Sequence, residues 1–87
     1  MAAAEVVWQR IVRHAGDEFR QIRGKPFTYR VVGPRTLGLD TTNRVVSRAA
    51  VERALERWPV DGPGGLSGLN APSYLYGLLA DPRVLGR

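Results

Sequence analysis

Residues 27–32 read Phe-Thr-Tyr-Arg-Val-Val, and this stretch decides the fold class. It is rich in aromatic and β-branched residues, and alternate side chains pass to opposite faces, which predicts a β-strand. Residues 18–23 form a less regular strand before it, and Gly24-Lys25 between the two can form a two-residue turn. The cross-strand pairs that this turn predicts are Ile22 with Phe27, Gln21 with Thr28, and Arg20 with Tyr29.

A third strand is expected after the Gly33-Pro34 turn, where Leu37 and Leu39 alternate with smaller residues. The three strands then form an antiparallel meander. Val45-Val46 is a candidate for a further short strand. Because helical patterns occur on both sides of these strands, the sequence predicts an α+β domain with its helices on one sheet face.

The helices are indicated by apolar residues at helical spacing. Residues 2–15 place Ala4, Val7, Trp8, Ile11, Val12 and Ala15 on one stripe, and Gly16 can close that helix. Ser47 is a good N-cap for a second helix over residues 48–58, which Pro59 ends. Arg48 with Glu52 and Arg53 with Glu56 are expected ion pairs on that helix.

Residues 59–72 contain Gly and Pro throughout and predict a flexible loop, followed by a short C-terminal helix over residues 72–80. We expect residues 1–87 to form one small domain. The residues expected to share its core are Trp8, Ile11, Val51, Leu55 and Leu78, with Trp58 at the margin.

Composition excludes several kinds of site. The 87 residues include no cysteine and one histidine, so neither a disulfide framework nor a Cys- or His-clustered metal site is expected. No apolar stretch is long enough to span a membrane, and the N-terminal residues do not resemble a secretory signal. We therefore expect a cytoplasmic protein with no metal and no cofactor.

Catalytic patterns are also weak. His14 and Asp17 could be combined with Ser47 or Ser67 as a triad, but no motif spacing supports that arrangement. Residues 62–68 are glycine-rich but lack the Gly-Lys-Ser/Thr ending of a phosphate-binding loop. We expect no catalytic residues and no enzyme activity.

The formal net charge of +5 favours anionic partners, and the excess lies in the first sixty residues. Cations gather on the expected hairpin beside Phe27 and Tyr29, a combination that suits phosphates and stacked bases. Because Phe27 and Tyr29 share one face with Ile22, alternation favours both rings as core residues, and the cations can still bind phosphate in that case. The residues expected to contact DNA or RNA, with low sequence specificity, are Arg20, Arg23, Lys25, Arg30, Arg44 and Arg48.

Two other interpretations stay open. The arginines of helix 48–58 could belong to a winged-helix recognition helix, although Glu52 and Glu56 on the same face would repel phosphates. Alternatively, the protein could bind another protein through the loop and an apolar patch. That patch would consist of Leu66, Leu69, Tyr74 and Tyr76.

Three blocks carry a resemblance to a known group of proteins: residues 24–29 (GKPFTY), residues 42–47 (TNRVVS) and residues 72–83 (PSYLYGLLADPR). Together they resemble a group of small uncharacterised bacterial proteins with the same aromatic hairpin, middle helix and Pro-Ser-Tyr helix. The resemblance spans about residues 16–84 and implies a stand-alone module of the bacterial cytoplasm. It implies no activity and no catalytic residue.

Overall fold

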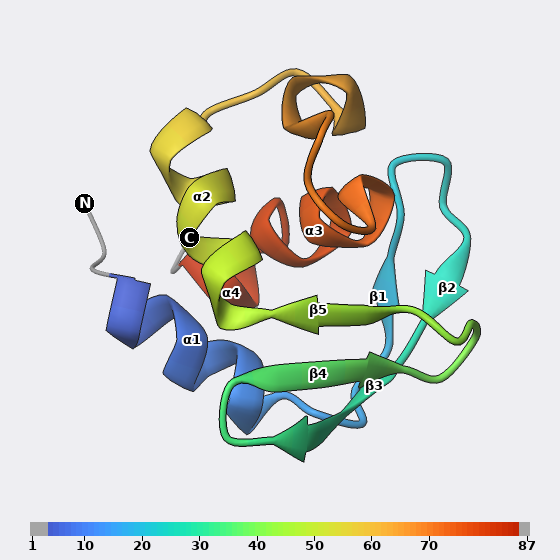
Figure 1. Ribbon diagram of the computed structural model, residues 1–87. Coiled ribbons are helices and arrows are strands. Elements are labelled where there is room, and N and C mark those ends of the chain that lie inside the picture. The colour runs from blue at the N-terminus through green and yellow to red at the C-terminus, as the bar shows by residue number, and fades with distance from the viewer. Residues whose placement is uncertain (1–3, 86–87) are drawn as a thin grey trace.

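The computed structural model describes residues 4–85 and confirms an α+β fold (Figure 1). The helices are α1 (Ala4–Arg13), α2 (Arg48–Arg57), α3 (Pro72–Leu79) and α4 (Pro82–Leu85), with one 3₁₀ turn, η1 (Pro63–Leu66). The strands are β1 (Phe19–Arg20), β2 (Pro26–Phe27), β3 (Tyr29–Gly33), β4 (Thr36–Leu39) and β5 (Val45–Ser47). In Figure 1, α1 and α2 lie to the left of α3, and the strands lie below and to the right of it.

Helix α1 forms as its apolar spacing predicts. Val7, Trp8 and Ile11 are buried, whereas Val12 at the edge of the stripe is 37% exposed. Gly16 follows the helix with φ +92°, a left-handed conformation that glycine adopts without steric cost. Its N–H donates to Tyr29 O at 2.9 Å, so the end of α1 is tied directly to β3. Ala2 and Ala3 of the expected helix lie outside the described residues.

The predicted three-stranded antiparallel sheet is present, with the strand order β3-β4-β5. Its third strand is β5, whereas the expected strand at residues 18–23 does not belong to it. Leu37 pairs with Val31 and Val46 and is buried on the inner face. On the outer face, Arg30 and Val32 lie over Gly38, and Val32 and Val45 are exposed to solvent. The sheet therefore buries one face only, as antiparallel sheets often do.

The β1–β2 hairpin forms a separate two-stranded sheet, and its register differs from the predicted one. Phe27 pairs with Phe19 rather than with Ile22. Gln21 N–H donates to Lys25 O at 3.0 Å, and Gly24, at φ +85°, donates its N–H to Gln21 O at 2.8 Å. This is a three-residue loop closed by a left-handed glycine, a common alternative to the two-residue turn. It brings Phe19 into the core and leaves Ile22 exposed at the tip.

Helix α2 begins where the sequence predicts, since the Ser47 side chain accepts a hydrogen bond from Ala50 N–H at 3.1 Å. Val51 is fully buried, but Leu55 and Trp58 are only half-buried, so Leu55 is less central to the core than expected. Of the two expected ion pairs, Arg48–Glu52 forms at 3.1 Å. The pair of Arg53 with Glu56 is not among the ion pairs of residues 4–85.

The Gly/Pro segment 59–72 has more structure than a bare loop. It contains η1, and Leu66 at the end of this turn is fully buried. Arg57 of α2 donates to Ser67 O at 2.7 Å and so holds the segment to the helix. The flexibility of the segment stays a prediction.

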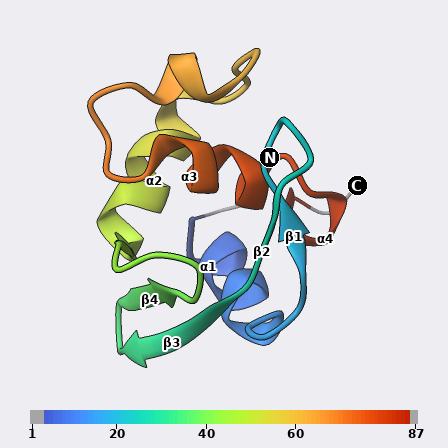
Figure 2. The ribbon, with the colours of Figure 1, turned by 90° about the vertical axis from the view of Figure 1, so that its right-hand side faces the viewer.

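The C-terminal helices complete the core. Helix α3 begins with Pro72 and buries Leu75, Leu78 and Leu79 as predicted. Helix α4 folds back beside α1, where Val84 is fully buried and its carbonyl accepts from Arg10 at 3.2 Å. Figure 2 shows α3 passing between α2 and the β1–β2 hairpin, which makes α3 the centre of the fold.

Candidate nucleic-acid interface

The structure divides the six predicted contact residues into two groups. Three of them have a carboxylate partner: Arg20 pairs with Glu18 at 2.9 Å, Arg30 with Asp40, and Arg48 with Glu52. Arg23, Lys25 and Arg44 are exposed and form no ion pair with any of the described residues 4–85. The predicted basic cluster is therefore smaller than the sequence indicates.

The pairing of Arg30 with Asp40 is reinforced by a second partner of Asp40. Thr28 Oγ1 donates to this carboxylate at 2.8 Å, and Arg30 donates to its other oxygen. These two hydrogen bonds hold the pKa of Asp40 below its ordinary value. Asp40 is therefore ionised at neutral pH and offsets the charge of Arg30.

Arg23 and Lys25 lie together at the tip of the β1–β2 hairpin, on either side of Gly24. Arg20, on the same hairpin, donates one bond to Glu18 and another to Gly24 O at 2.9 Å. An exposed ion pair of this kind contributes little, so a phosphate can replace Glu18 as the partner of Arg20. Arg44 lies in a different place, in the loop between β4 and β5. The hairpin tip is thus the densest group of uncompensated cations among the predicted residues.

The aromatic residues of the hairpin do not face solvent. Phe27 and Tyr29 are buried, and both rings lie within about 6 Å of the Phe19 ring. Tyr29 Oη donates to Ile11 O at 2.6 Å, and burial raises the pKa of this phenol far above its ordinary value. These rings are core residues and are not available for base stacking.

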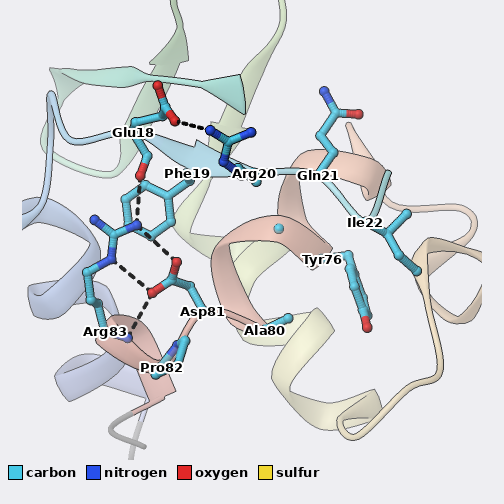
Figure 3. Close-up of a pocket in the computed structure, with 11 residues that line it drawn as sticks. Glu18, Phe19, Arg20, Gln21, Ile22, Tyr76, Ala80, Asp81, Pro82 and Arg83 are labelled. Carbon is cyan, nitrogen blue, oxygen red and sulfur yellow. Dashed lines mark hydrogen bonds and ion pairs between the residues drawn. The ribbon is translucent and has the colours of Figure 1, made fainter. Parts of the chain in front are cut away.

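A groove beside the hairpin provides a surface that sequence reasoning missed (Figure 3). It has a volume of about 520 Å³ and runs between β1 on one side and α3 and α4 on the other. Its lining residues are Glu18, Phe19, Arg20, Gln21, Ile22, Tyr76, Gly77, Ala80, Asp81, Pro82 and Arg83. These residues come from two segments far apart in the chain. The one local feature of the sequence that pointed to this groove is Gly77, a glycine inside a helical pattern.

An ion pair lines one half of the groove. Arg83 donates through Nε and Nη2 to the two carboxylate oxygens of Asp81, each at 2.9 Å, and through Nη2 to Glu18 O at 2.7 Å. Its guanidinium also lies 4.0 Å from the centre of the Phe19 ring. The hydrogen bonds from Arg83 hold the pKa of Asp81 below its ordinary value, and Asp81 in turn raises the pKa of Arg83. The bond from Arg83 to Glu18 O and its contact with the Phe19 ring fasten α4 to β1.

The other half of the groove is apolar. Ile22 and Tyr76 stand there, as Figure 3 shows. The Tyr76 ring is half-buried and lies 5.7 Å from the Trp58 ring of α2. Ile22 is 53% exposed and is the most exposed large apolar residue of the described chain. The hairpin tip therefore combines cations with an apolar surface, although not with the aromatic residues that the sequence suggested.

The structure also differs from the apolar patch that was expected to bind another protein. Leu66 is fully buried and cannot belong to a surface, and Leu69 is only partly exposed. Tyr74 and Tyr76 are half-buried, and the Tyr74 ring packs edge-on against Phe27 at 5.0 Å. Apolar residues are exposed elsewhere, among them Val32 and Val45 on the outer face of the sheet, at 49% and 44%.

Among residues 4–85, His14 interacts with the carboxylate of Asp17 and with no serine side chain. His14 Nδ1 lies 2.9 Å from Asp17 Oδ2, and the Ser47 hydroxyl is used to cap α2. Within residues 4–85, no three His, Cys, Asp or Glu side chains are grouped to hold a metal ion.

Comparison of the chain with family models, with curated proteins and with solved structures finds no match. The resemblance to small bacterial proteins therefore stays a prediction. In residues 4–85, every helix is too short or too polar to cross a membrane.

Proposed function

We propose that this protein is a non-enzymatic module that binds nucleic acid mainly through its phosphates. The observation that carries the proposal is the hairpin tip, where Arg23 and Lys25 are exposed and lack an acidic partner among the described residues. Cations at such a position replace the counterions of a phosphate backbone and so gain affinity without reading sequence. A location in the bacterial cytoplasm, which the resemblance implies, is part of this proposal.

Low sequence specificity is expected from the elements that bear the cations. Specific readout requires side chains that reach base edges from an element fitting a DNA groove. Helix α2 is unsuited to this role because Arg48 is held by Glu52 and because Glu56 is exposed beside Arg57. Phosphate contact therefore dominates.

The test is a salt titration of binding to a random duplex and to a single strand, followed by fluorescence anisotropy. In the variant Arg23→Ala/Lys25→Ala, the slope of log K against log salt should flatten by about two units. Affinity for unrelated sequences should fall equally. The control variant Arg13→Ala/Arg53→Ala removes the same charge from exposed positions on α1 and α2, and its slope should stay close to that of the wild type.

The proposal fails if the wild type binds neither ligand more tightly than about 10⁻⁴ M at low salt. It also fails if both double variants flatten the slope equally, because binding would then follow net charge alone. Either result favours the second candidate, a protein partner.

The second candidate function, protein binding, is favoured by the uncovered outer face of the β3-β4-β5 sheet. Val32 and Val45 are exposed there on either side of Gly38. An apolar contact on this face would depend little on salt, which separates it from phosphate binding.

A further inference from the structure

The hairpin tip and the groove are parts of one continuous surface. Ile22 lines the groove, and Arg23 follows it directly in the hairpin loop. The tip also lies against the segment before η1, since a Cβ at Gly62 would stand 3.3 Å from Ile22 Cδ1. The unpaired cations of the hairpin loop are therefore adjacent to the apolar half of the groove.

The groove itself is close to electrically neutral. Its two carboxylates, Glu18 and Asp81, are paired with Arg20 and Arg83, each at 2.9 Å. The net positive charge of the surface comes from Arg23 and Lys25, which follow Ile22 in the hairpin loop. A ligand that complements this surface carries negative charge beside a flat group with apolar faces. A nucleotide strand has this construction, in its phosphates and its bases.

The apolar half of the groove suits one face of a base. The Tyr76 ring packs against the Trp58 ring, with the centroids 5.7 Å apart, and Ile22 lines the groove beside Tyr76 (Figure 3). Aromatic side chains on a binding surface serve as stacking platforms for bases of any sequence. The volume of about 520 Å³ lies within the usual range for a site that binds a small organic group.

We propose that this groove receives an unpaired base, with its neighbouring phosphates on Arg23 and Lys25, so that the ligand is single-stranded nucleic acid. The inference rests on the proposed phosphate binding at the hairpin tip. A base within a duplex is stacked on both faces and paired, and it cannot enter the groove without being unstacked. Single strands of any sequence are therefore preferred to duplexes.

The test compares a fluorescein-labelled oligothymidylate with a duplex of equal length at low salt. The wild type should bind the single strand more tightly. Tyr76→Leu keeps apolar volume but removes the ring, and it should weaken single-strand binding by about 5- to 150-fold, as expected for the loss of one stacked base. Duplex binding and the salt slope should not change, because no charge is altered. Tyr76→Phe, which keeps the ring, should bind like the wild type.

A second measurement keeps the protein unchanged and alters the ligand. An abasic phosphodiester strand of equal length and charge should bind the wild type more weakly than the oligothymidylate, by a similar factor. This comparison holds even if Tyr76→Leu fails to fold.

The outcomes separate the two proposals. If single strand, duplex and abasic strand bind equally, and Arg23→Ala/Lys25→Ala still weakens all of them, the base site is refuted and phosphate binding stands. If the wild type binds none of them, phosphate binding itself is refuted and the base site with it.

Discussion

Substituting Gly77 by alanine should destabilise the protein, although alanine is the better helix former. Gly77 lies in the middle of α3, where alanine is favoured by about 1 kcal/mol in an exposed helix. Here the helix packs against β1, and a Cβ at this position would stand 2.6 Å from Arg20 O and 3.0 Å from Phe27 Cε1. The nearest atom is backbone and cannot rotate away.

The magnitude follows from the displacement that the methyl group requires. An ordinary C···O contact is about 3.3–3.6 Å, so α3 and β1 must separate by roughly 0.7–1 Å. Overpacking costs about 1–3 kcal/mol, and a clash with a backbone atom belongs in the upper part of that range, about 2–3 kcal/mol. After the helix gain is subtracted, the free energy of unfolding should fall by about 1–2 kcal/mol, and Tm should fall by roughly 5–15 °C.

The assay is urea denaturation followed by tryptophan fluorescence, since Trp8 is buried and Trp58 is half-buried. Gly64→Ala is the matched control. Gly64 lies exposed in η1, and a Cβ there would have no atom within 4 Å. Its effect should stay within about 0.5 kcal/mol. If Gly77→Ala is as stable as the wild type, the close packing of α3 on β1 is wrong.

Two further predictions concern the core and the ion pair beside the groove. Leu78→Ala should lower the free energy of unfolding by about 2–5 kcal/mol because Leu78 is fully buried. Leu55 is half-buried, so Leu55→Ala should cost clearly less in the same urea denaturation assay. Equal losses for the two variants would contradict the observed burial. Because the pKa of Asp81 is lowered in the folded protein, its charge stabilises the fold above the ordinary carboxyl pKa of about 3.9, and this contribution is lost as pH falls below that value. The difference in the free energy of unfolding between the wild type and Asp81→Asn should therefore be constant from about pH 5 to 8 and shrink toward pH 3. A difference independent of pH would show that the ion pair of Asp81 with Arg83 contributes nothing.

Local patterns in the sequence were sufficient for the elements that depend on near neighbours. The apolar stripe of α1, the Ser47 cap, the Pro72 start of α3 and the burial of Phe27 and Tyr29 were all predicted correctly. Helical periodicity and capping are set by residues within one turn of one another, and strand alternation is set by the pleat itself. For this reason the α+β class could be deduced without any long-range information.

The register of the β1–β2 hairpin could not be predicted from neighbouring residues alone. Gly24 is compatible both with a two-residue turn and with a left-handed residue closing a three-residue loop. The choice between them depends on which aromatic residues the core can bury, and pairing Phe19 with Phe27 buries both rings beside Tyr29. The exposure of Ile22, and hence the apolar side of the groove, follows from that choice.

The candidate site likewise depends on the tertiary structure. The sequence alone determined that cations concentrate on the hairpin, but not which of them are offset by acids. Arg30 is neutralised by Asp40 through the pairing of β3 with β4, and the groove exists only because α3 and α4 pack on β1. Charge is a property of each residue, whereas its compensation depends on distances between segments, and those distances are fixed only when the chain packs around one core.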